Sequence, residues 1–432
     1  MKKFIAILMA VVLVVTGAFV LTGCSGNNEN ENQTTEAPTG STEPTKETKT
    51  IDNVKVGFIF LHDENSTYDL NFLNGAKEAC EKLGVEYLIK KNIPESNDCY
   101  DAAAELADSG CNVVFADSFG HESNMKLAAA DYPEVQFCHA TGTQALVAEL
   151  DNYHNAFASI YDGRFLAGIA AGMKLNEMIE EGKITAEQAK IGYVGAWPYA
   201  EVKSGYTSFF LGARSVCPTA TMEVTFTNSW FDIALEKEGA LNLINDGCVL
   251  ISQHADSEGA PKACEEKGVP DVSYNISTID LGPNTAIVSS KINWEPYFEL
   301  MINSVAKGEA IPANYCGTLE TGSVVLTEIN EKVAAEGTAE AIEDAKAKLI
   351  SGELHVFDTA TFTVDPANEA NAGVAANIKV DEEGHLTSYL ADVEDMGDFA
   401  GETEVVKDGV FCESDGRSAP YFDITIDGIT LK

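Results

Sequence analysis

The chain has 432 residues, a length that corresponds to two or three domains of ordinary size. It carries 68 acidic against 28 basic residues, a formal net charge of -40. A chain this acidic cannot neutralise phosphate groups, which excludes nucleic acid as a partner. Its hydrophobic content of 45% excludes disorder throughout the chain.

The first 24 residues resemble a bacterial lipoprotein signal. Lys2 and Lys3 form a short positive segment, an apolar run covers residues 4–20, and Leu-Thr-Gly leads into Cys24. The alternative is a plain transmembrane anchor, for which a run of 17 residues is short. We therefore expect Cys24 to carry a lipid that holds the protein at the extracytoplasmic face of the cell membrane.

Residues 25–50 are rich in Asn, Glu, Thr, Ser, Gly and Pro and have no apolar period. Such a composition cannot bury enough surface to offset the entropy of ordering, so we expect a disordered tether. Its r.m.s. reach would be roughly 25–30 Å.

The nine remaining cysteines are an odd number and include no C-x-x-C pair. This pattern fits a disulfide framework poorly, and we interpret the thiols as small buried hydrophobic groups. No Cys/His cluster has zinc-binding spacing, so the sequence predicts neither a metal nor a cofactor.

From residue 55 the sequence alternates short apolar runs with segments of helical period, which indicates βαβ units and parallel sheets. The pattern runs twice, so we predict two similar α/β lobes. The predicted strands are 55–61, 85–89, 111–116, 135–140, 191–195, 222–227, 248–252, 272–275 and 286–290. The predicted helices are 71–83, 96–109, 122–132, 158–180, 201–214, 233–245 and 294–307. Residues 361–432 are acidic and β-like, with a loop-rich stretch at 364–390 and a final strand at 422–431.

Sequence signatures of enzymes are missing. No G-x-G-x-x-G follows the first strand, and the chain contains no Walker A loop, H-E-x-x-H or G-x-S-x-G. We therefore expect a binding protein and not an enzyme.

Polar and aromatic side chains follow several predicted strands. The carboxyl ends of parallel strands are where open α/β sheets bind ligands, and rings beside hydrogen-bonding groups suit a small flat polar ligand. Each residue also has a simpler interpretation: a ring can cover the edge of the core, and an Asp can cap a helix. The candidates are Asn65, Tyr68, Asp69, Phe119, Trp197, Trp230, Asp232, His254 and Asp256.

Several segments resemble the basic membrane lipoprotein family of ABC-transporter substrate-binding proteins, which includes purine nucleoside receptors. The resemblance covers about residues 54–355. It implies a periplasmic-binding-protein type I fold, in which two Rossmann-like lobes joined by a hinge close on a ligand. The segments that carry it are 119–125, 131–137, 139–142, 164–172, 191–194, 211–218 and 227–232.

The resemblance also implies roles for single residues. Residues 64–69 correspond to a family stretch that stacks a ring on the base, which places Tyr68 at the ring position and Asp69 at a polar neighbour. Lys291 corresponds to a late-strand Lys, although it can also extend along apolar surface to solvent. In the family, the partner of this Lys is an acid that can bind both ribose hydroxyls. This sequence has no acid in the corresponding stretch near Asn275, so ribose recognition stays open and a free base is a possible ligand.

The expected ligand is thus a purine nucleoside or nucleobase, which a monomeric receptor delivers to ABC permease subunits. One alternative is a receptor for another small polar solute, such as a sugar or an amino-acid derivative. Another is a surface nucleoside hydrolase. We expect the first lobe to consist of residues 51–156 together with 276–305. The second lobe is expected to consist of residues 157–275 together with 306–360.

Overall fold

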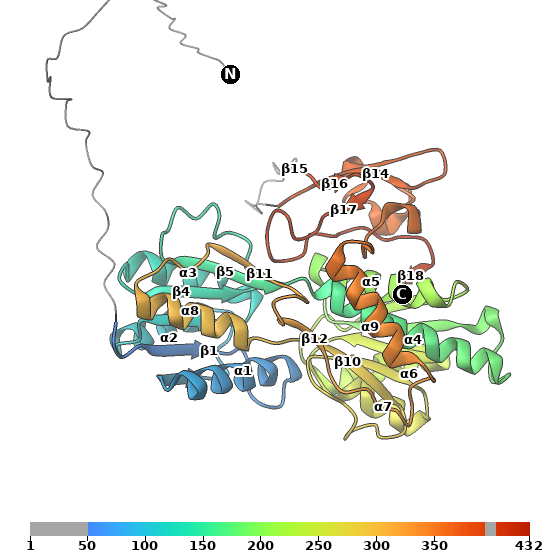
Figure 1. Cartoon of the computed structure of the whole chain (residues 1–432), viewed down its shortest axis with the longest axis horizontal. Helices are drawn as coiled ribbons and strands as arrows, with labels where there is room; N and C mark the ends of the chain where they lie inside the picture. Colours follow the sequence, from blue (N-terminus) through green and yellow to red (C-terminus); the bar gives the residue numbers. More distant parts are fainter. Residues whose placement is uncertain (1–50, 394–402) are drawn as a thin grey trace, which may run out of the picture. The chain divides into compact units, whose positions relative to one another are not determined.

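Two separate sheets, each covered by helices, form the body of the protein (Figure 1). The computed structural model describes residues 51–393 and 403–432. The predicted lipidation of Cys24 and the predicted tether at 25–50 therefore lie outside the described residues. The predicted α/β class with parallel sheets is confirmed.

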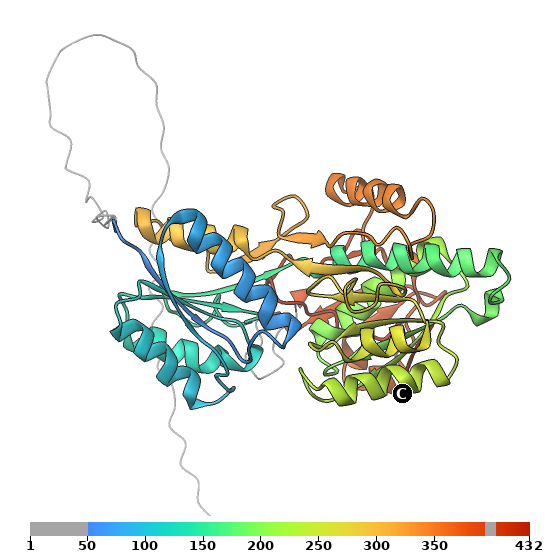
Figure 2. The ribbon, with the colours of Figure 1, turned by 90° about the horizontal axis from the view of Figure 1, so that it is seen from below.

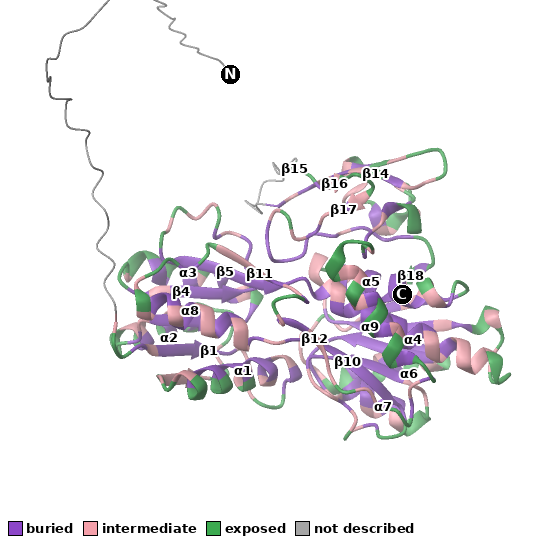
Figure 3. Cartoon of the chain, in the orientation of Figure 1, coloured by how far each residue is buried: buried purple, intermediate pink, exposed green. Residues whose placement is uncertain are grey.

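The first sheet has six parallel strands in the order β11-β5-β4-β3-β1-β2. These are β1 (Lys55–Ile59), β2 (Glu86–Lys90), β3 (Val113–Ala116), β4 (Gln136–Ala140), β5 (Tyr153–Ala158) and β11 (Asn314–Gly317). Its central strands are buried, as a parallel sheet between two helical layers requires (Figure 3). Figure 2 shows α1 and α8 on one face and α2 and α3 on the other. These helices are α1 (Thr67–Leu83), α2 (Asn97–Asp108), α3 (Glu122–Asp131) and α8 (Glu295–Lys307).

The second sheet has seven strands in the order β12-β10-β9-β8-β6-β7-β18. Only the β10–β12 pair among these described strands is antiparallel. The strands are β6 (Lys190–Gly195), β7 (Thr221–Phe226), β8 (Leu250–His254), β9 (Asp271–Tyr274), β10 (Ala286–Ile292), β12 (Val324–Leu326) and β18 (Ile429–Leu431). The helices are α4 (Ile160–Glu180), α5 (Ala200–Val216), α6 (Ile233–Asn245), α7 (Gly259–Lys267) and α9 (Thr338–Ser351).

The chain passes between the lobes three times before residue 327: from β5 to α4, from β10 to α8 and from β11 to β12. This differs from the expected division. Range 276–305 was expected in the first lobe, yet its strand β10 pairs with β9 in the second sheet. Only its helix α8 packs on α1. Likewise β11, in the range expected in the second lobe, pairs with β5.

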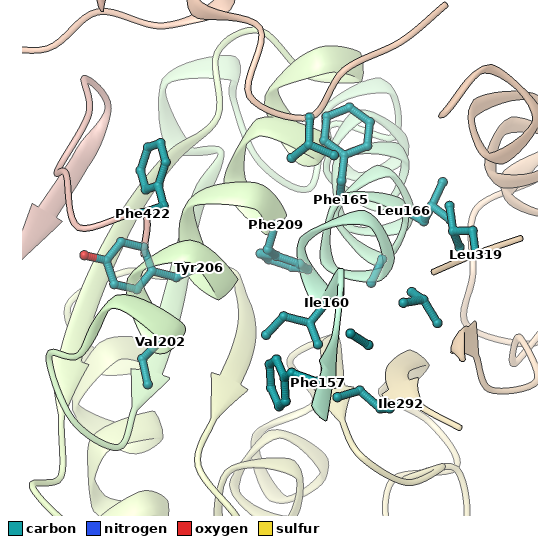
Figure 4. Close-up of a cluster of buried hydrophobic side chains, with 14 of the residues drawn as sticks. Phe157, Ile160, Phe165, Leu166, Val202, Tyr206, Phe209, Ile292, Leu319 and Phe422 are labelled. Atoms are coloured by element: carbon teal, nitrogen blue, oxygen red, sulfur yellow. The ribbon is translucent and has the colours of Figure 1, made fainter. Parts of the chain in front are cut away.

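Helices α4 and α5 approach each other unusually closely at two glycines. A Cβ atom on Gly168 would lie 2.1 Å from the Phe209 carbonyl oxygen, and one on Gly212 would lie 2.0 Å from that of Phe165. Both positions therefore require glycine. The buried rings of Phe165 and Phe209 belong to the core cluster drawn in Figure 4.

The C-terminal segment, here residues 361–432, is acidic and partly β, as predicted. It contains β13 (Ile378–Val380), β14 (Leu386–Ala391), β15 (Thr403–Glu404), β16 (Val406–Lys407) and β17 (Val410–Phe411). Of the strand predicted within 422–431, only β18 forms, and it extends the second sheet parallel to β7. Short 3-10 turns occur at Phe119–His121, Ala186–Gln188, Thr359–Thr361, Glu369–Asn371 and Ala375–Asn377.

The C-terminal segment is attached to both lobes. Ser204 of α5 donates its hydroxyl to the Glu413 carboxylate at 2.6 Å, and Ser418 donates to Asn314 of β11 through its backbone N–H and its hydroxyl. The Phe422 side chain is fully buried and lies beside Tyr206 of α5 in Figure 4. The segment is thus part of the folded body.

The nine cysteines among the described residues are free thiols, and seven of them are buried. The interpretation of these residues as small buried hydrophobic groups is confirmed for those seven. Cys316 and Cys412 are partly exposed.

Candidate functional site

Two adjoining chambers lie where strand ends of the two sheets face each other. The inner chamber has a volume of about 20 Å³ and the outer chamber about 690 Å³. They share Phe119, Thr141, Glu201 and Trp230 as lining residues. The remaining inner-chamber residues are Leu61, His62, Tyr68, Asp69, Ser118 and Asp256.

The first turn of α1 supplies Tyr68 and Asp69. Ser66 caps this helix, since its side-chain oxygen accepts from the Asp69 N–H, and its hydroxyl donates to the Asp69 carboxylate at 2.6 Å. The His62 backbone N–H donates to the same carboxylate at 2.7 Å. Burial raises the pKa of Asp69, but the hydrogen bonds from His62 and Ser66 lower it overall. Asp69 is therefore held in one position as a hydrogen-bond acceptor.

The Tyr68 ring is fixed at both ends. Its hydroxyl donates to the Asp117 carbonyl oxygen at 2.9 Å, and its ring meets Phe72 edge-on at 4.8 Å between centroids. The side chain is only partly exposed. The ring therefore presents itself to the chamber in a defined orientation.

The second lobe contributes Asp256, which follows β8. Its backbone carbonyl accepts from the Thr67 N–H of the first lobe at 2.8 Å, and its side chain accepts from the Asn275 amide at 3.5 Å. Asn275 is buried and has a left-handed backbone with φ 71°. The two lobes are in direct contact at the inner chamber.

Buried carboxyl groups from both lobes crowd this region. Burial, reinforced by the nearby charge of Asp69, raises the pKa of Asp117 well above its usual range. Burial raises that of Asp256 in the same way, reinforced by Glu236 and Asp69. Burial also raises the pKa of Glu236 to about 7. Protonated carboxyl groups can donate as well as accept a hydrogen bond, which suits a ligand edge that carries both kinds of group.

A buried arginine, Arg164, lies close to these acids. The Arg164 guanidinium of α4 lies 3.5 Å from the centroid of the Tyr274 ring and donates to the Gln253 carbonyl oxygen at 2.9 Å. His254, whose Nε2 lies 3.3 Å from Glu201, is fully enclosed beside it. Burial, with the charge of Arg164, lowers the pKa of His254 to about 4. His254 thus contacts Glu201, which lines both chambers, but does not itself line either of them.

Exposed aromatic rings surround the chamber mouth. Tyr199 stacks on Trp197 at 5.8 Å and lies 5.9 Å from Phe119 and 6.1 Å from Trp230. Phe119 and Tyr199 are 41% and 45% exposed, unusual values for large rings. Trp197 lines a side hollow of about 320 Å³ next to the chambers.

Besides Trp197, His254 and Asn275, three further predicted residues do not line the chambers. Asn65 is exposed and donates its amide to Asp63. Asp232 caps α6 by accepting from the Ala234 and Leu235 N–H groups, the simpler role considered for it. Lys291 lies in β10 opposite Val325 and lines neither chamber. Asn275 bonds to Asp256 and lines neither chamber.

Sequence reasoning missed several lining residues. Glu201 lies in the first turn of α5, after β6, and Thr141 follows β4 with φ 61°, so both lie after strand ends as the predicted residues do. Tyr199 lies in the same turn as the candidate Trp197 but was not itself predicted. The C-terminal segment, which lines the outer chamber through Tyr389, Asp392, Arg417 and Tyr421, carried no local signal at all.

No group of three or more His, Cys, Asp or Glu side chains that could hold a metal ion occurs in residues 51–393 and 403–432. The acids at the inner chamber are spread over both lobes and engaged by hydrogen bonds. What the arrangement can do is hold a ring between aromatic faces and bond its polar edge.

The family model for PnrA-like ABC-transporter substrate-binding proteins matches residues 59–359. The chain belongs to this family. The resemblance found in the sequence is thereby confirmed, and the function at this level is substrate binding for an ABC transporter, which takes place outside the cytoplasm.

Relatives of this PnrA-like chain differ in their named ligands. A purine-binding protein of Brucella abortus (strain 2308) is 29% identical over 80% of this chain and 94% of its own length. A Haloferax volcanii protein named as an ABC transporter glucose-binding protein is 31% identical over 60% of this chain and 62% of its own length. A solute-binding protein of an ABC transporter from Aeropyrum pernix K1 has the same fold, with TM-score 0.60 at 17% identity over 75% of this chain and 97% of its own.

Among the described residues, no helix combines the length and the apolar character that a membrane span requires.

Proposed function

We propose that this PnrA-like protein is a lipid-anchored receptor that binds a purine nucleoside or nucleobase between its lobes and delivers it to an ABC permease. One observation carries the proposal. The inner chamber joins the rings of Tyr68 and Trp230 with the carboxyl groups of Asp69 and Asp256, drawn from both lobes. The purine-binding relative from Brucella abortus supports the same ligand class.

The chemistry of a purine matches these groups. Its flat π surface stacks on an aromatic ring, which contributes about 1–3 kcal/mol per base. Its edge alternates donors and acceptors, which the carboxyl groups of Asp69 and Asp256 can bond.

Ligand entry requires movement. A chamber of about 20 Å³ has room for about one water molecule and not for a ring system. We infer that the lobes part at the three crossing segments to admit the ligand and close on it afterwards. Closure would create the surface that the permease recognises.

Replacing Tyr68 by alanine should weaken purine binding by about 1–3 kcal/mol, at least a roughly tenfold rise in Kd, because the stacking face is lost. Tyr68→Phe keeps the ring and should bind more tightly than Tyr68→Ala. Isothermal titration of the full chain in detergent with adenosine and adenine measures both values. Tyr132→Ala, which removes a ring outside both chambers, is the matched control. Equal affinity of wild type and Tyr68→Ala would contradict the placement of the ligand.

The Haloferax volcanii relative favours a sugar as a second candidate ligand. Acidic groups beside aromatic rings also suit sugar hydroxyls. Titration with D-glucose separates the two candidates, since the proposal expects heat from the purine compound alone.

Chromatography of adenosine recovered from the complex should show it intact, and released adenine would instead indicate a hydrolase.

The anchor has a separate test. In cells labelled with a radioactive fatty acid, Cys24→Ala should abolish label on this protein, because the thiol that accepts the lipid is gone. Cys80→Ala, which alters a buried thiol, should keep the label. Label retained in Cys24→Ala would refute lipidation at this residue.

A further inference from the structure

The outer chamber has three walls. The first lobe supplies Phe119, Thr141 and Thr143, and the second lobe supplies Tyr199, Glu201 and Trp230. The third wall comes from the C-terminal segment, beyond residue 359, where the family match ends. It includes Gly373, Asn377, Tyr389, Asp392, Arg417 and Tyr421.

Hydrogen bonds hold the third wall in place. The buried Arg417 guanidinium donates to the carbonyl oxygens of Ala419 and Pro420 and, across the segment, to those of Asp392 and Val393. The Glu413 carboxylate accepts from the Tyr421 and Phe422 N–H groups as well as from Ser204. The third wall is thus an integral part of the fold, and the hydrogen bond between Ser204 and Glu413 connects it to α5.

The charges of the outer chamber restrict what it can hold. Glu201, Asp392 and Asp423 line it, and Arg417 is the one basic side chain among its described lining residues. The guanidinium of Arg417 is directed to carbonyl oxygens, and Asp423 is paired with Lys203. An excess of acidic groups repels phosphate and attracts hydroxyl, amino or cationic groups.

The two chambers adjoin, because Phe119, Thr141, Glu201 and Trp230 line both of them. A ligand whose base is held at the inner chamber would therefore have its remaining part next to a space of about 690 Å³, within the range of small-molecule sites.

We propose that the C-terminal segment forms a third wall of the ligand site, and that the outer chamber binds the part of the ligand that projects from the base: a neutral or cationic group with hydroxyl or amino donors. This proposal rests on the proposed function for the position of the base. It explains how a chain that lacks the expected acid at Asn275 could still contact a sugar or a larger substituent.

The test places a bulky side chain in the outer chamber by a substitution in the C-terminal segment, which leaves the residues of both lobes unchanged. Gly373 is exposed, and a Cβ atom added to it meets no other atom within 4 Å, so a side chain at this position starts without a clash and Gly373→Trp is a suitable variant. The variant should raise the Kd for adenosine at least about tenfold and leave that for adenine unchanged. Glu382→Trp, in the exposed turn between β13 and β14, is the matched control. Asn377→Ala is a second variant, which removes an amide and adds no bulk. Adenosine monophosphate should bind wild type more weakly than adenosine.

The outcomes distinguish the two proposals. Adenosine binding that is equal in wild type, Gly373→Trp and Asn377→Ala would overturn the third wall and leave the purine receptor standing. Binding of D-glucose alone would overturn the purine receptor, and the same variants would then test the wall with glucose. No binding of any of these compounds to wild type would overturn both.

Discussion

Replacing Phe422 by alanine should lower the free energy of unfolding by about 3–5 kcal/mol. The Phe422 side chain is 0% exposed, stacks on Phe357 at 4.4 Å and meets Phe411 edge-on at 4.7 Å. Removing it leaves a cavity between the C-terminal segment and α5, which the surrounding rings can fill only in part. Urea unfolding followed by circular dichroism measures the loss.

The matched control is Phe119→Ala. That ring is 41% exposed, so its removal should change stability by much less than the loss at Phe422. If Phe422→Ala and Phe119→Ala were equally stable, the C-terminal segment would not be packed on the second lobe in solution.

Raising the pH from 4.5 to 7 should destabilise wild type relative to Glu413→Gln, by at most ~1.4 kcal/mol per pH unit. Burial raises the pKa of the Glu413 carboxyl from 4.5 to about 7. Between these values the folded protein holds a proton that the unfolded chain has released, so stability falls as the pH rises. Glutamine resembles the protonated carboxyl and has no such dependence.

Unfolding curves of both proteins across this pH range give the difference directly. Glu383→Gln, which alters an exposed carboxylate in the turn after β13, should follow wild type at every pH. Parallel curves for wild type and Glu413→Gln would mean that Glu413 is ionised without cost where it lies.

Much of the fold was predictable because the first lobe and the helices around it follow local rules. Gly84 ends α1 with φ 67°, as its sequence position predicts. The helix begins four residues before the predicted start, because Ser66 caps it. Strand β5 was missed because its sequence includes His154 and Asn155, whose polar groups are satisfied by contacts that only the folded sheet provides.

The residues of the site could be predicted only where they follow the carboxyl ends of predicted strands. Tyr68, Asp69 and Asp256 meet in the inner chamber because parallel strands present their carboxyl ends at one edge. Asp232 could not be distinguished from a ligand contact, since helix caps and ligand sites use the same residue types at the same ends. Tyr389 and Tyr421 could not be found, because the folding of distant residues brings them there.

The pairing of β18 with β7 bears on how the second sheet is completed. The two strands lie about 200 residues apart in the chain, so their pairing is a long-range contact that closes a large loop. Until β18 pairs, one side of β7 is an open edge that can pair with another chain. Completion of the second sheet, and with it resistance to edge-to-edge aggregation, therefore depends on a contact that forms late in folding. Truncations or bulky fusions close to residues 429–431 should reduce soluble yield even when both chambers are intact.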